Sequence, residues 1–220
     1  MSKAKIGQII DLLIKAYGDR KWHKRLEPVG ELVLTILSQN TSDTNSHRAY
    51  ASLVETFDTW DRILKADTEE IASAIRSGGL ADVKAKYIKN ALQALKKETT
   101  DFNLSFLVDI TVESARKWLI KLPGVGMKTA SCVLLFSLGM PAFPVDTHVY
   151  RVAGRLGLIG KKVSVDAAHL EMERITPIED TYRCHVLLIE HGRKTCKAQR
   201  PLCPSCVLAK ICPSYKIFVK

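Results

Sequence analysis

The chain has 220 residues, of which 46% are apolar and 25% charged, and this composition excludes a disordered or fibrous protein. Lysine and arginine number 33 against 23 acidic residues, which leaves a formal charge of +10. Such an excess favours a polyanionic partner. Nucleic acid is preferred over a membrane, because no apolar run approaches the ~18 residues of a membrane-spanning helix. The N-terminus has no apolar signal-peptide core, so we expect a reducing, intracellular location.

Apolar residues recur at three- and four-residue steps along most of the chain, and this pattern is typical of helices. Helices are expected, in chain order, over residues 6–17, 29–37, 49–57, 83–95 and 115–119, and again after residues 126 and 146. On the helix over 83–95 the lysines, Lys84, Lys86 and Lys89 among them, are expected mainly on the solvent-facing side. No alternating run bounded by a hairpin turn is found, so the sequence predicts an all-α fold.

Four of the six cysteines lie near the C-terminus with the spacing C-x6-C-x2-C-x5-C, namely Cys196, Cys203, Cys206 and Cys212. Clustered thiols in a reducing compartment are typical of metal binding. Structural zinc usually uses two close pairs, whereas only one close pair is present here, so the spacing favours a [4Fe–4S] cluster over zinc. Between His191 and Lys220 there are seven lysines or arginines and no acidic residue. These cations are expected to lie against phosphate, to offset the charge of the thiolates, or both.

A second motif joins two of the predicted helices. Leu122-Pro123-Gly124-Val125-Gly126 is followed by Met127-Lys128-Thr129-Ala130. Proline and two glycines predict a tight turn whose amides can approach a ligand and open onto a helix N-terminus, which suits a phosphate oxygen. An ordinary corner between two helices is the alternative.

The turn is followed, eighteen residues after Lys128, by the segment Val145-Asp146-Thr147-His148-Val149. LPGVG-x-KTA, VDTHV and the cysteine spacing, in this order, resemble the endonuclease III family of helix–hairpin–helix DNA glycosylases over nearly the whole chain. The resemblance implies two helical lobes flanking a DNA-binding groove. One would be a six-helix lobe over 24–138 that holds the helix–hairpin–helix motif. The other would combine 1–23 with 139–220 and carry the [4Fe–4S] cluster loop.

The resemblance also implies a bifunctional DNA glycosylase/AP lyase that removes damaged, oxidised pyrimidines. Lys128 matches the nucleophilic lysine, whose neutral amine attacks C1′ of an extruded nucleotide and leaves a Schiff base that permits β-elimination. Asp146, expected to face Lys128 across the groove, matches the aspartate that stabilises the cationic sugar. The alternatives are a phosphate-binding or solvated Lys128 and an Asp146 that only caps the following helix.

Two loops, 38–41 and 78–80, are expected by resemblance to fill the gap left by the flipped base. Leu80 suits an apolar wedge between base steps. Family members commonly carry glutamine where this chain has Asn40, with Gln39 beside it, so either side chain is a candidate for the gap. A polar loop that only caps the next helix, through Ser42 or Asp43, is the alternative. The expected DNA-contacting residues are Gln39, Asn40, Leu80, Gly124, Gly126, His148, Lys197 and Arg200.

The expected partner is double-stranded DNA with damaged bases or abasic sites. The protein is expected to act as a cytoplasmic, nucleoid-associated monomer without a membrane partner. Two other functions stay open: a mismatch glycosylase acting on thymine or adenine, and a non-catalytic helix–hairpin–helix DNA-binding module. Adenine-specific relatives generally lack a lysine at the position of Lys128, which argues against that branch, and a mere binding module needs neither Lys128 nor Asp146.

Overall fold

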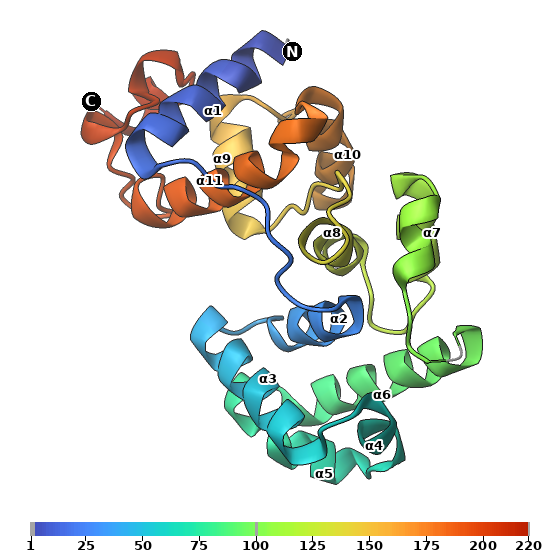
Figure 1. The fold of residues 1–220 in the computed structure, drawn as a ribbon. Coiled ribbons are helices and arrows are strands. Elements are labelled where there is room, and N and C mark those ends of the chain that lie inside the picture. Colours follow the sequence, from blue (N-terminus) through green and yellow to red (C-terminus); the bar gives the residue numbers. More distant parts are fainter. Residues whose placement is uncertain (1–2, 100, 220) are drawn as a thin grey trace. The chain divides into compact units, whose positions relative to one another are not determined.

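A computed structural model describes residues 3–99 and 101–219, and all regular elements among them are helical (Figure 1). The predicted all-α fold is therefore confirmed. The chain divides into two compact units: a central unit, Lys24–Met140, and a terminal unit that combines Met1–His23 with Pro141–Lys220. The lobes expected from the sequence, 24–138 and 1–23 plus 139–220, remain a prediction as folding domains, because compact packing alone does not show that each part folds independently.

The described residues of the central unit form seven α-helices and two 3-10 turns, where six helices are expected from the sequence. α4 and α5 each span at most about two turns, which is too short for a periodic apolar pattern to stand out. The elements are α2 (Pro28–Leu37), α3 (Asp43–Phe57), α4 (Trp60–Lys65), α5 (Thr68–Ala74), η1 (Arg76–Gly78), α6 (Ala81–Glu98), η2 (Ser105–Asp109), α7 (Val112–Ile120) and α8 (Met127–Phe136).

Helix α2 lies in the middle of the central unit, packed against α8 and α3 (Figure 1). Its residues from Val29 to Leu37 are all buried, as the apolar run predicts. One of them, Glu31, is fully buried and forms an ion pair with Arg25, which donates through both Nε and Nη2. The guanidinium of Arg25 also lies 4.1 Å from the ring centroid of Phe136, so this pair ties α2 to the end of α8.

The terminal unit is built from segments far apart in the sequence. Its elements are α1 (Lys3–Tyr17), α9 (Thr147–Leu156), α10 (Val165–Ile175), η3 (Ile178–Asp180), α11 (Thr181–Lys194), η4 (Cys203–Ser205), η5 (Ala209–Ile211) and α12 (Tyr215–Phe218). Helix α11 packs against both α9 and α1 (Figure 1). The predicted stripe of α1, with Ile6, Ile9 and Leu13 fully buried, supplies one wall of the core.

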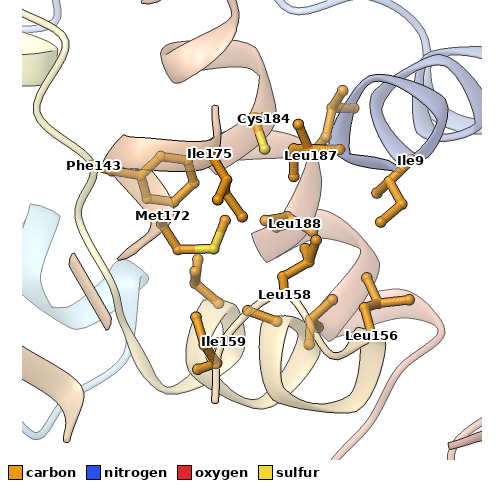
Figure 2. Packing of buried hydrophobic residues seen from close by; sticks show 14 of the residues in the cluster. Ile9, Phe143, Leu156, Leu158, Ile159, Met172, Ile175, Cys184, Leu187 and Leu188 are labelled. Carbon is orange, nitrogen blue, oxygen red and sulfur yellow. The ribbon is translucent and has the colours of Figure 1, made fainter. Parts of the chain in front are cut away.

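Figure 2 shows this core, in which Ile9 from α1 meets Leu187 and Leu188 from α11. Leu156 at the end of α9 and Met172 on α10 complete it from the other sides. Burial of each such side chain stabilises the fold by about 1.5–3 kcal/mol, so the N-terminal helix is held to the C-terminal segment by apolar packing.

One expectation for α6 is wrong. Lys84 is only 2% exposed, although the pattern of the helix assigns the lysines mainly to its solvent-facing side. Lys86, on the same helix, is exposed as expected. No described helix combines the length and apolar character that crossing a bilayer requires.

Candidate functional site

The hairpin, residues 122–126, is a tight turn between α7 and α8. The amide of Val125 donates to the carbonyl of Leu122 at 3.1 Å, which closes the turn. Gly124 has φ of +77°, and a Cβ atom there would lie 3.0 Å from Cγ of Tyr87. The turn therefore requires glycine at this position for two reasons, its left-handed backbone and the close aromatic neighbour.

The hairpin opens onto the N-terminus of α8. Gly126 precedes this helix, and no described atom lies within 4 Å of the place that a Cβ atom would take there. Because the N-cap residue is a glycine, it has no side chain that could cap the first amides of α8. These amides and the positive end of the helix suit an anionic oxygen. Lys128 is half-buried on the first turn of α8, next to these amides.

Asp146 sits at the N-cap of α9, in the terminal unit. Its Oδ1 accepts a hydrogen bond from the amide of Val149 at 2.7 Å, so the capping role expected from the sequence is confirmed. The segment before it is buried and anchored, because the amide of Phe143 donates to the carboxylate of Glu173 at 2.9 Å. The cap and this anchor hold the carboxylate of Asp146 in one orientation.

His148, the second residue of α9, is tied to the rest of the terminal unit. Nη2 of Arg151 donates to Nδ1 of His148 at 3.1 Å and to the carbonyl of Gly192 at 2.9 Å. Nε of the same arginine donates to the carbonyl of Cys196 at 3.0 Å. Arg151 therefore connects the residue expected near the DNA backbone with the first cysteine of the C-terminal group, a link that no sequence pattern indicates.

Both loops expected to fill the flipped-base gap contain a non-glycine residue in the left-handed region, Asn40 with φ of +53° and Leu80 with φ of +50°. Leu80 is 57% exposed, as an apolar wedge requires. The cap of α3 comes from Ser42, whose side chain accepts from the amide of Asn45 at 3.2 Å. The cap that the alternative expects from Ser42 is therefore present, and neither Gln39 nor Asn40 takes part in it.

Cys196, Cys203, Cys206 and Cys212 line one pocket of about 390 Å³, a volume that includes its opening to solvent. No disulfide joins the six cysteines, all of which lie in the described part of the chain, and Cys132 and Cys184 are buried away from this pocket. Burial raises the pKa of Cys203, and the negative charges of the Cys196 and Cys212 thiolates raise it further. A cationic group bound in the pocket that the four thiols share would offset repulsion between their thiolates.

Arg155 frames this pocket from α9. Its Nη1 donates to Sγ of Cys196 at 3.3 Å and to the carbonyl of Lys197 at 2.7 Å, and its Nη2 donates to the carbonyl of Ala198 at 3.0 Å. Lys197 itself is exposed, and so is Arg200, which adopts a left-handed φ of +48°. An arginine on a helix gives no sequence signal for such a role, because the pattern is the same as for a solvated side chain.

His191, near the end of α11, forms another wall of the pocket. Its Nδ1 lies 2.9 Å from the hydroxyl of Tyr17, and its Nε2 lies 3.7 Å from Sγ of Cys206. Burial lowers the pKa of His191 to about 4, so the ring is neutral at pH 7. The histidine therefore adds no charge beside the thiols and links them to α1.

The comparisons with known proteins agree with this geometry. Residues 33–177 match the model of the HhH-GPD superfamily of base excision DNA repair proteins. Endonuclease III of Sulfolobus acidocaldarius is 38% identical over 84% of this chain and 81% of its own. A protein of Arabidopsis thaliana is 43% identical over 74% of this chain, and the match spans 55% of that longer protein. The solved structure of a trapped covalent intermediate of endonuclease III with DNA has a TM-score of 0.85 at 32% identity and covers 100% of both chains.

Lys128 lies in the central unit and Asp146 in the terminal unit. The family match extends over both units, from α2 to α10, and includes both residues. The chain belongs to the endonuclease III family of HhH-GPD base excision DNA repair proteins, and thus to the DNA glycosylases/AP lyases.

Proposed function

We propose that the protein removes oxidised pyrimidines from double-stranded DNA and then cleaves the strand, with Lys128 as the nucleophile and Asp146 as its acidic partner. The observation that carries the proposal is the placement of Lys128. It lies on the first turn of α8, directly after a hairpin whose Gly126 leaves room for a ligand. An amine in this position lies next to a site suited to the phosphate of the nucleotide that it attacks.

The chemistry follows from the two side chains. The neutral amine of Lys128 adds to C1′ of the extruded deoxyribose while the bond from C1′ to the base breaks, and the base leaves with the bonding electrons. The amine then loses its proton and the sugar ring opens to the Schiff base. Loss of a C2′ proton to water forms the C2′–C3′ double bond, and the C3′–O bond breaks to release the 3′ phosphate. The carboxylate of Asp146 stabilises the positive charge on the sugar and accepts the proton of the amine.

The phosphate contacts come from backbone and basic side chains. Amides of the hairpin around Gly124 and Gly126 grip the backbone beside the extruded nucleotide, and His148 contacts it near the lesion. Lys197 and Arg200 add charge from the exposed loop of the terminal unit. Leu80 and either Gln39 or Asn40 fill the space that the base vacates. We further propose that the protein acts as a monomer on nucleoid DNA.

The cysteine pocket supports a [4Fe–4S] cluster. Four thiols line a shared pocket, and only Cys203 and Cys206 form the close pair that structural zinc sites usually contain twice, so the donors fit a polynuclear group better than one zinc ion. When bound, the cluster would supply a structural cross-link and a redox-active centre. Cys196, Cys203, Cys206 and Cys212 would hold it, while Arg155 and His191 fix the loop around it.

Borohydride reduction of the Schiff base tests the function directly. Wild-type protein mixed with DNA that contains an abasic site is expected to form a covalent adduct, and Lys128→Ala is expected to form none. An adduct that survives Lys128→Ala would show that another amine is the nucleophile. A panel of duplexes that differ only in one base, oxidised pyrimidines beside G:T and A:G mispairs, then tests the lesion class. Faster release from a mispair than from any oxidised pyrimidine would contradict the substrate assignment.

A further inference from the structure

The buried ammonium of Lys84 joins two loops of the central unit. Lys84 lies on the first turn of α6 and is only 2% exposed. Its Nζ donates to the carbonyl of Leu37 at 2.7 Å and to that of Gly78 at 2.7 Å. Leu37 ends α2 directly before the loop 38–41, and Gly78 ends η1 and begins the loop 78–80. One side chain thus bonds to the backbone next to both loops.

The ammonium is held by two converging helix ends. The last carbonyls of a helix carry partial negative charge, and a lysine that bonds to them is stabilised there. None of the carboxylates among the described residues forms an ion pair with Lys84, and burial lowers the pKa of its ammonium. Burial of a charged group is costly, and an apolar side chain of the same length would fill this space without that cost. The two hydrogen bonds to backbone carbonyls are therefore what lysine provides at this position and an apolar side chain does not.

The loops that Lys84 joins are under backbone strain at their exposed tips. Asn40 and Leu80 both have φ in the left-handed region, and leucine is a poor residue for the N-cap position that Leu80 occupies at α6. Such conformations persist only where the surrounding structure holds them. Behind the second loop, a Cβ atom at Gly78 would lie 3.0 Å from Cβ of Ala49, so η1 is held closely against α3.

We propose that Lys84 is a positioning residue that fixes the loops 38–41 and 78–80 relative to each other, so that their tips enter the DNA together during nucleotide extrusion. The inference rests on the proposed function, because it assigns Lys84 a part in that step. Leu80 and the side chain from the loop 38–41, Gln39 or Asn40, are far apart in the sequence but must fit one gap in the duplex. Their separation is set by whatever joins the loops, and small misplacements of such groups lower rates strongly.

Lys84→Met tests the proposal, because methionine keeps an unbranched apolar side chain but cannot donate to the two carbonyls. Lys89→Met is the matched control. Lys89 also lies on α6 and its Nζ donates to one backbone carbonyl, that of Ala66, at 2.5 Å, but this bond leads to the end of α4 and to neither loop. Both variants lose one lysine and its carbonyl bonding from the same helix.

Two substrates separate positioning from general damage to the protein. The first is a damaged pyrimidine in duplex DNA, which must be extruded. The second is an abasic site in single-stranded DNA, which has no base to extrude. For Lys84→Met we expect base release from the duplex to fall by about 10- to 100-fold. Strand cleavage of the single-stranded substrate should stay within about twofold of wild type, and Lys89→Met should leave both rates within that range.

Each rate is divided by the amount of enzyme that borohydride traps on abasic DNA. A variant that is partly misfolded is then compared with wild type per active molecule. Equal loss on both substrates, or no loss on either, would overturn the proposal.

Should Lys84→Met fail to fold, Lys84→Gln retains an amide donor and is expected to show a smaller loss confined to the duplex. In a cycle with Leu80→Ala, the double variant should lose no more than the worse single variant, and additive losses would refute action through Leu80. Absence of any adduct with wild-type protein would refute the proposed function instead.

Discussion

Asp146 is expected to carry two separable roles, and substitution by asparagine or alanine should divide them. The cap is a hydrogen bond of 2.7 Å from the amide of Val149 to Oδ1. Asparagine caps a helix about as well as aspartate, but it loses the favourable interaction of the charge with the helix end, about 0.3–1 kcal/mol. Alanine loses the cap as well, at a cost of about 1 kcal/mol more.

These free energies translate into small thermal shifts. For a protein of this size, 1 kcal/mol corresponds to about 2–4 °C in Tm, so Asp146→Asn is expected to melt within about 1–4 °C of wild type. Asp146→Ala is expected to melt about 2–4 °C lower than the asparagine variant. Base release should fall much further in both variants. The loss of one group that stabilises developing charge typically lowers the rate by about 10²–10³-fold.

The assay is single-turnover release of an oxidised pyrimidine, measured beside thermal melting of the same samples. Ser164→Ala is the matched control, because Ser164 caps α10 in the same unit through the amide of Ala167 at 3.2 Å. It should lower Tm by a similar amount to the loss of the Asp146 cap and leave base release unchanged. Full activity in Asp146→Asn would refute the catalytic role, and equal losses in Ser164→Ala would trace the effect to stability alone.

Three further predictions concern the scaffold. Arg25→Met should lower the free energy of unfolding in urea by about 3–5 kcal/mol, because it leaves the buried carboxylate of Glu31 without its ion-pair partner. Lys24→Met removes an exposed ion pair with Glu27 and should change this free energy by less than about 1 kcal/mol. Gly124→Ala should destabilise the protein by about 1–3 kcal/mol in the same assay, because of the positive φ at this position and the close contact with Tyr87. The new methyl group of Gly126→Ala would point into open space, so this variant should melt like wild type and bind abasic DNA more weakly. Iron analysis should find four irons per chain with broad visible absorbance, and stoichiometric zinc would contradict the cluster assignment.

Much of the fold follows from local pattern. The stripe of Ile6, Ile9 and Leu13 predicts α1 and its buried face, since residues three and four apart lie on one side of a helix. The apolar run of α2 and the glycines of the hairpin are equally local signals. Family membership is also readable from the sequence, because it depends on short motifs in a fixed order.

Other features depend on partners that are distant in the sequence. Arg155 bonds to a loop more than 40 positions away. Its role therefore appears only when α9 and the cysteine loop are brought together. The same holds for His191 and Tyr17, which meet through the packing of α1 on α11.

Lys84 shows the division most clearly. Sequence periodicity determines that α6 is a helix, but a lysine within that pattern is assigned to the solvent-facing side because a buried ammonium is costly. Only the tertiary structure brings the carbonyl ends of α2 and η1 to its Nζ and so makes burial tolerable. The sequence by itself determined the family, seven of the helices (α1, α2, α3, α6, α7, α8 and α9) and the residue types of the chemistry. The tertiary structure decided which polar side chains hold distant loops in place, because those contacts follow from packing and not from neighbouring residues.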